Sequence, residues 1–190
     1  MHLALSWDLF IVVIFAVVVA YSFIIGRNQT LKVILGTYVA ILCADGLGNV
    51  FSKYLFASQP LMRTLKLFAI SNEDQGVIFF KVLIFLLLIV LIAVRGMFHV
   101  ESAEHGPITM RMVVMLLLGL MSAGLMMSAV LVFISGASMI GVNVPASNIL
   151  ADVYRDSRLA RIMMDFANMW FFLPGLTFVI LGVLHKKQAA

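Results

Sequence analysis

The chain has 190 residues, of which 63% are hydrophobic and 12% are charged, with a formal net charge of +4. A soluble domain has about 45–50% apolar and about 25% charged residues, so a water-soluble core of this length could not cover so much apolar surface. The composition therefore excludes a soluble globular protein and predicts an all-α, polytopic transmembrane protein with a single integral membrane domain over residues 1–190.

Five apolar stretches are long enough, or nearly long enough, to cross a bilayer as helices. In chain order they cover residues 9–26, 33–51, 76–94, 112–135 and 169–184. The fifth stretch holds Pro174 and Gly175, which we expect to kink or break the helix. The sequence therefore predicts four to five spans.

Two segments between these stretches are amphipathic, at about residues 60–70 and 147–168. In the second segment apolar side chains share one face of a helix: Leu159, Ile162, Met163, Phe166 and Trp170. Arginines fall on its other faces: Arg155, Arg158 and Arg161. We expect both segments to lie in the membrane interface, with these arginines and Trp170 at the lipid surface. Packing against another protein subunit is the alternative.

Basic residues give the orientation, because they are enriched in short loops on the cytoplasmic side of the membrane. The two sides of a five-span protein would carry equal numbers of them, but one group lies directly at the span ends. We therefore expect residues 27–32, 95–111 and 185–190 in the cytoplasm and the N-terminus outside. Basic residues at span ends also meet anionic lipid, so the positive charge does not indicate a nucleic-acid partner.

Small residues recur at every fourth position in the second stretch: Gly36, Ala40, Ala44 and Gly48. They form a narrow ridge along one helix, which allows a neighbouring helix to approach closely. The fourth stretch repeats this pattern in two pairs: Gly119 with Ala123, and Gly124 with Ser128. The sequence predicts tight helix packing at these positions and leaves open whether the partner belongs to the same chain.

A line of polar side chains runs beside the ridge: Tyr38, Asp45, Asn49 and Ser52. A carboxylate inside a span is costly and normally faces protein or water, with a partner. Lys81 enters the third stretch from the same side of the membrane as Asp45, so we expect an Asp45–Lys81 ion pair. A frayed helix end that reaches water, or an ion or proton site, are the alternatives.

Other candidates for chemistry are weak. One loop carries residue types that bind transition metals, at a spacing that matches no established site: His99, Glu101, Glu104 and His105. The methionines of the fourth stretch are expected to fill the core, and the single Cys43 is expected to be a buried, inert thiol. No nucleotide-binding, zinc-protease or nucleophile motif is present, so we expect no cofactor, no metal and no enzymatic activity.

The order of features resembles a known family. An acid, Asp8, precedes the first span in "WDLFIVVIF", which closes with "IIGRNQ" and is followed by a second span, "GTYVAILCADGLG". A later amphipathic segment, "DSRLARIMMDFANMWFF", is led by Ser157. This arrangement resembles the colicin V production protein family of bacterial inner-membrane proteins, best over residues 7–56 and 155–172. The resemblance implies a bacterial plasma membrane and a link to colicin secretion and envelope physiology, without a mechanism.

Two functions fit these expectations. The first is a non-enzymatic, oligomeric scaffold or small subunit of a membrane complex in secretion, transport or motility, with the lipid bilayer, other copies of the chain or other membrane subunits as partners. The second is an ion or proton channel or transporter component that uses Asp45 and Lys81, with Tyr38 and Asn49 along a polar path. A dry helix facing the polar line favours the first function, and a wet cavity favours the second.

Overall fold

The computed structural model describes residues 7–54, 73–95, 108–138, 155 and 157–188. In this part of the chain the fold is all-helical, as predicted. The described helices are α1 (Trp7–Ile25), α2 (Arg27–Tyr54), α4 (Glu73–Arg95), α5 (Ile108–Ile134), α7 (Arg158–Asp165) and α8 (Ala167–Gln188). The amphipathic segment at about 60–70 and the loop from His99 to His105 lie outside the described residues.

Four of these helices are long and apolar enough to cross a membrane: α1, α2, α4 and α5. A fifth span is formed if α7 and α8 count as one, although they meet at an angle of 58°. The predicted range of four to five spans is therefore confirmed. The chain is a multi-pass helical membrane protein.

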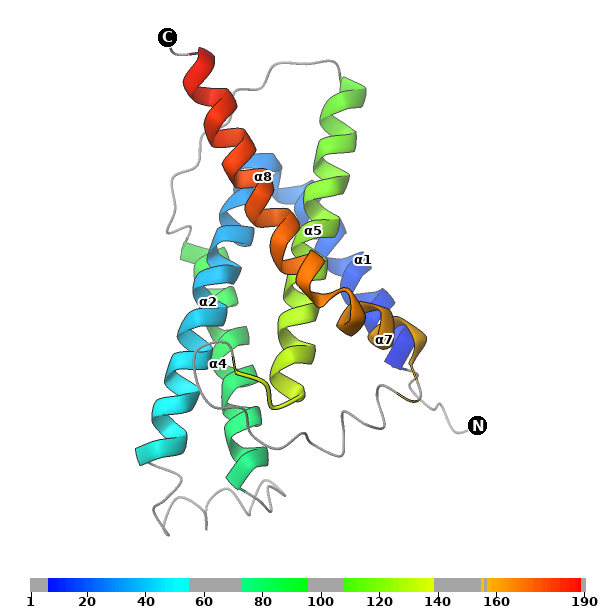
Figure 1. Ribbon diagram of the computed structural model, residues 1–190. Helices are drawn as coiled ribbons and strands as arrows, with labels where there is room; N and C mark the ends of the chain where they lie inside the picture. Colours follow the sequence, from blue (N-terminus) through cyan, green and yellow to red (C-terminus); the bar gives the residue numbers. More distant parts are fainter. Residues whose placement is uncertain (1–6, 55–72, 96–107, 139–154, 156, 189–190) are drawn as a thin grey trace.

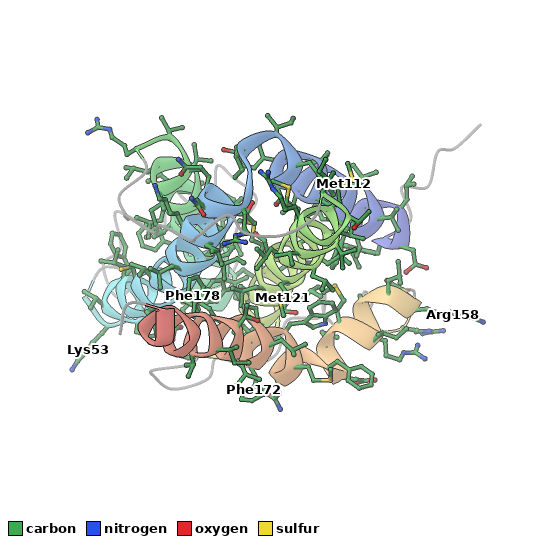
Figure 2. All side chains as sticks on the ribbon, turned by 90° about the horizontal axis from the view of Figure 1, so that it is seen from above. Lys53, Met112, Met121, Arg158, Phe172 and Phe178 are labelled. Carbon is green, nitrogen blue, oxygen red and sulfur yellow. The ribbon has the colours of Figure 1, made fainter. Side chains whose placement is uncertain are left out.

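Successive long helices run in opposite directions, and α5 lies at the centre of the bundle (Figure 1). It contacts each of the other five described helices, whereas α2 packs mainly on α4 and α1 mainly on α5. The core between α2, α4 and α5 contains Phe85 and Phe133, whose rings meet edge to face at 5.6 Å. Seen from above, Met121 and Phe178 lie toward this interior, whereas Met112 and Phe172 point outward (Figure 2).

The first two helices are joined by one residue. Gly26 has a φ of 80°, in the left-handed region that glycine adopts without strain, and it turns the chain directly from α1 into α2. The hydroxyl of Thr30 donates to the carbonyl of Gly26 at 3.0 Å, which satisfies a polar group at this junction. Residues 27–32, which lie between the first two apolar stretches, are the first turns of α2, because this helix begins at Arg27.

The sequence suggested a kink or a break at Pro174. The helix is not broken there, because α8 continues through this residue. Proline has no N–H to donate within the turn. The hydroxyl of Tyr38, on α2, donates to the carbonyl of Phe171 in that same turn. A neighbouring helix thus supplies a donor where the proline disturbs the helix, as is common for prolines in membrane spans.

The bend occurs instead at Phe166, between α7 and α8. Ser157 is the N-cap of α7, and its hydroxyl accepts a hydrogen bond from the amide of Ala160 at 2.9 Å. That hydroxyl donates to the carboxylate of Asp8, at the start of α1, at 2.6 Å. Asp8 also accepts from the amide of Leu159 at 3.1 Å. A carboxylate therefore fixes the positive end of α7 to the first helix.

Candidate functional site

The candidate site is an ion pair inside the bundle. Lys81 Nζ, on α4, lies 2.6 Å from Asp45 Oδ1, on α2. The two side chains are 1% and 0% exposed, so the pair is closed off from the surroundings of the protein. The predicted pair is confirmed. The alternative of a frayed helix end is wrong, because α2 continues past Asp45 to Tyr54.

A hydroxyl from the end of α5 completes the pair. Ser138 Oγ lies 3.0 and 2.9 Å from the two carboxylate oxygens of Asp45, and its single O–H donates to this carboxylate. Asn49, one turn along α2, donates to Ser138 Oγ at 3.1 Å. Gly136, with a φ of 78°, turns the chain at the end of α5 and brings Ser138 to this position. The four polar side chains form one connected hydrogen-bonded group.

The sequence did not single out Ser138. It follows the fourth apolar stretch, where nothing local distinguishes it from an ordinary loop serine. The only sequence signal is the run Ser135–Gly136–Ala137–Ser138, small and polar residues directly after a span. This run permits a tight turn back into the protein, but it does not name Asp45 as the target.

Gly48 makes room for the lysine. A Cβ atom at this position would lie 2.3 Å from Cγ and 2.7 Å from Cε of Lys81, which is closer than such atoms approach in proteins. One end of the small-residue ridge therefore carries the stem of Lys81. At the other end, Gly36 accommodates Ile92, whose Cγ2 would lie 2.4 Å from an added Cβ.

The ridge therefore faces α4 of the same chain. Ala40 and Ala44, between the two glycines, are fully buried. This answers the question that the sequence left open. Contact between α2 and α4 is intramolecular at both ends of the ridge, and it brings Lys81 and Asp45 to the same depth.

The small residues of α5 face two other helices. Gly119 lies against Val19 and Ser22 of α1, where an added Cβ would be 3.3–3.4 Å away. Gly124 faces the indole ring of Trp170, and an added Cβ would overlap it at 2.0 Å. Trp170, which we expected at the lipid surface, is only partly exposed, because part of its ring fills the notch at Gly124. Ala123 and Ser128, the other members of these pairs, are buried.

The polar line on α2 does not act as one surface. Asp45 and Asn49 belong to the group around Lys81, but Tyr38 faces α8 and Ser52 is exposed. Within the described residues, the candidate channel residues therefore point to two different neighbours. Cys43 is exposed on α2, so the expectation of a buried thiol is wrong.

The arginines expected at the interface are exposed on or beside α7: Arg155, Arg158 and Arg161. The apolar face predicted for this segment is only partly buried, since Met163 is buried whereas Ile162 and Phe166 are half exposed. Of the predicted helix 147–168, the structure describes residues 155 and 157–168. Here α7 covers only Arg158–Asp165, because Ser157 caps its start and the chain bends at Phe166.

In this arrangement the buried hydrogen-bonded group around Asp45 holds two opposite charges together. The ammonium donates to a carboxylate that also accepts from a hydroxyl, so both charges are compensated at a depth where an unpaired charge is expensive. Among the described residues, no cluster of three metal-ligand side chains occurs. Comparison of the chain with protein-family models, with curated proteins and with solved structures finds no match.

The first prediction concerns the energetics of the pair. Lys81→Met leaves the carboxylate of Asp45 buried without its cation, and we expect a loss of about 3–5 kcal/mol in the free energy of unfolding. Adding Asp45→Asn removes the orphaned charge and keeps an oxygen for Ser138, so the double variant should regain most of this loss. Unfolding of the purified protein in detergent measures all four corners of the cycle. Additive effects of the two substitutions would contradict a coupled pair.

The second prediction concerns the space for Lys81. Alanine is favoured over glycine in a helix by about 1 kcal/mol, so Gly46→Ala, which meets nothing within 4 Å, should leave the protein as stable or more stable. Gly48→Ala should destabilise it by about 1–3 kcal/mol, because its methyl group displaces the stem of Lys81. The thermal midpoints of the two variants test this, and equal midpoints would contradict it.

Proposed function

We propose that the chain is a non-enzymatic protein of the bacterial plasma membrane that acts as an oligomeric scaffold or as a small subunit of a secretion, transport or motility complex. The observation that carries this proposal is the burial of Asp45 and Lys81, at 0% and 1% exposure, against each other. Charges that face a dry neighbouring helix fit a structural role. If the two residues lined a channel, their side chains would instead face water.

The resemblance to colicin V production proteins supports the same class. Two of the residues that carry it, Asp8 and Ser157, are 149 positions apart and meet through a hydrogen bond of 2.6 Å. These two residues therefore join α1 to α7 through one hydrogen bond. We also propose that the N-terminus lies outside the cytoplasm, because basic residues cluster at the opposite ends of the spans.

Assembly has to use outer surfaces. The small-residue ridge of α2 is occupied by α4 of the same chain, so it is not available to another copy. The outer faces of the spans are apolar, and each presents large side chains, such as Val17 on α1, Val90 on α4 and Val179 on α8. Contacts with further subunits are proposed to form on one of these faces.

The third prediction tests assembly. A photoreactive amino acid at Val17, Val90 or Val179, each 61–63% exposed, should crosslink on one face to a protein of defined mass in intact cells. The same amino acid at Phe172, 63% exposed on α8, extends the scan along that helix. Native mass spectrometry of the gently extracted protein should show a complex of the same composition. A monomer in the spectrometer, with lipid adducts alone from every outer position, would contradict the proposal.

The alternative function is an ion or proton channel or transporter component. The observation in its favour is the pair itself, because ionisable residues within spans often mark ion or proton pathways. Such a role requires a second state in which Asp45 and Lys81 separate and reach water.

The fourth prediction separates the two functions. In liposomes, the scaffold role predicts that the wild-type protein passes protons, Na⁺ and K⁺ no faster than protein-free vesicles, with Asp45→Asn and Lys53→Gln giving the same result. The Lys53 variant controls for a change of charge at an exposed site. Flux through the wild type that is lost in Asp45→Asn but kept in Lys53→Gln would overturn the scaffold role and establish transport.

A further inference from the structure

An apolar groove lies on the opposite part of the bundle from the ion pair. It has a volume of about 470 Å³ and is lined by side chains of α1, α5, α7 and α8, among them Val12, Ala16, Leu120, Ile162 and Trp170. This volume is within the range of about 300–1,000 Å³ that is typical of ligand pockets. The groove is not used by the proposed function, and the inference below does not depend on that function.

The groove results from the bend between α7 and α8. Because α7 departs from α8 at 58°, it lies across α1 and α5, and the angle between the helices is left unfilled. Trp170 forms one wall, held in the notch at Gly124 and edge-on to Phe15 at a ring distance of 6.1 Å. Asp8 fixes the other side of this arrangement by binding the start of α7.

The position of the groove indicates its occupant. Val12, Ala16 and Leu120 belong to α1 and α5, which cross the membrane, so the groove opens at the depth of the hydrocarbon core. The molecules present at that depth in quantity are the acyl chains of lipids. The side chains that line the groove are apolar, which fits a hydrocarbon chain and offers little to a polar ligand.

A cationic side chain stands beside the groove. Arg158 is exposed on α7, one turn before Ile162, so it flanks the edge of the apolar face that carries Ile162. A guanidinium group binds phosphate through paired hydrogen bonds. The carboxylate of Asp8 accepts from the hydroxyl of Ser157 and the amide of Leu159, and it lies close enough to attract Arg158. A phosphate bound at this end would therefore share the guanidinium of Arg158 with Asp8.

We propose that this groove is a phospholipid-binding site, in which one acyl chain lies along α1 and α5 and the phosphate is bound by Arg158. The lipid comes from the surrounding bilayer. It fills the angle between α7 and α8, and it thereby holds the bent helix pair against the first span.

The two tryptophans of the chain make a direct test possible. In a Trp7→Phe background, Trp170 is the sole source of tryptophan fluorescence, and it lines the groove. Phosphatidylglycerol with dibrominated acyl chains, a contact quencher, is titrated into the protein in lipid-free detergent micelles. We expect saturable quenching of Trp170 by a small amount of this lipid.

Matched substitutions on α1 identify the groove. Ala16→Phe fills it and should lose most of the saturable quenching, whereas Val17→Phe, on the adjacent outward-facing position, should retain it. Val12→Phe and Val13→Phe form a second pair of the same kind, used if Ala16→Phe does not fold. Quenching that is equal within both pairs indicates contact with surrounding lipid only and overturns the site.

A second comparison tests the phosphate. Arg158→Gln should raise the lipid concentration for half-quenching several-fold, while Lys53→Gln should not change it. Lys53 and Arg158 lie at opposite sides of the molecule when it is seen from above (Figure 2). If Arg158→Gln titrates like the wild type, the assignment of the phosphate to this residue is overturned.

Discussion

Asp45 and Lys81 bring opposite charges into contact between α2 and α4, at a depth where neither charge is stable alone. The stem of the lysine reaches the carboxylate because Gly48 leaves room for it. The carboxylate also accepts from Ser138, which fixes the segment after α5 to α2. One ion pair therefore sets the spacing of two helices and the path of the chain after a third.

Close packing at small residues holds the other helices of the bundle together. In a membrane there is no hydrophobic force between helices, so contact depends on backbones approaching closely and on satisfied polar groups. Gly36 and Gly48 supply this approach for α2 and α4, Gly119 supplies it for α1 and α5, and Gly124 supplies it for α5 and Trp170. These glycines stabilise the single chain, so any assembly of several chains has to rely on its outer surface.

The helix pair α7 and α8 is attached to the bundle by a different interaction. Asp8 accepts from the hydroxyl of Ser157 and the amide of Leu159, which holds the start of α7 against α1. The bend between α7 and α8 leaves the groove beside Trp170 open to the hydrocarbon core. The polar interior around Asp45 and this apolar groove are thus separate features, one closed by the protein and the other suited to lipid.

The sequence by itself determined that the chain crosses a membrane, which stretches do so, and that Asp45 needs a partner, because composition and local spacing carry this information. It also indicated Lys81, since depth along a helix follows from residue number. Only the tertiary structure decided that the ridge of α2 faces α4 of the same chain, that Ser138 completes the pair, and that Trp170 lies at Gly124. These contacts depend on which helices become neighbours, and this is set jointly by residues far apart in the chain.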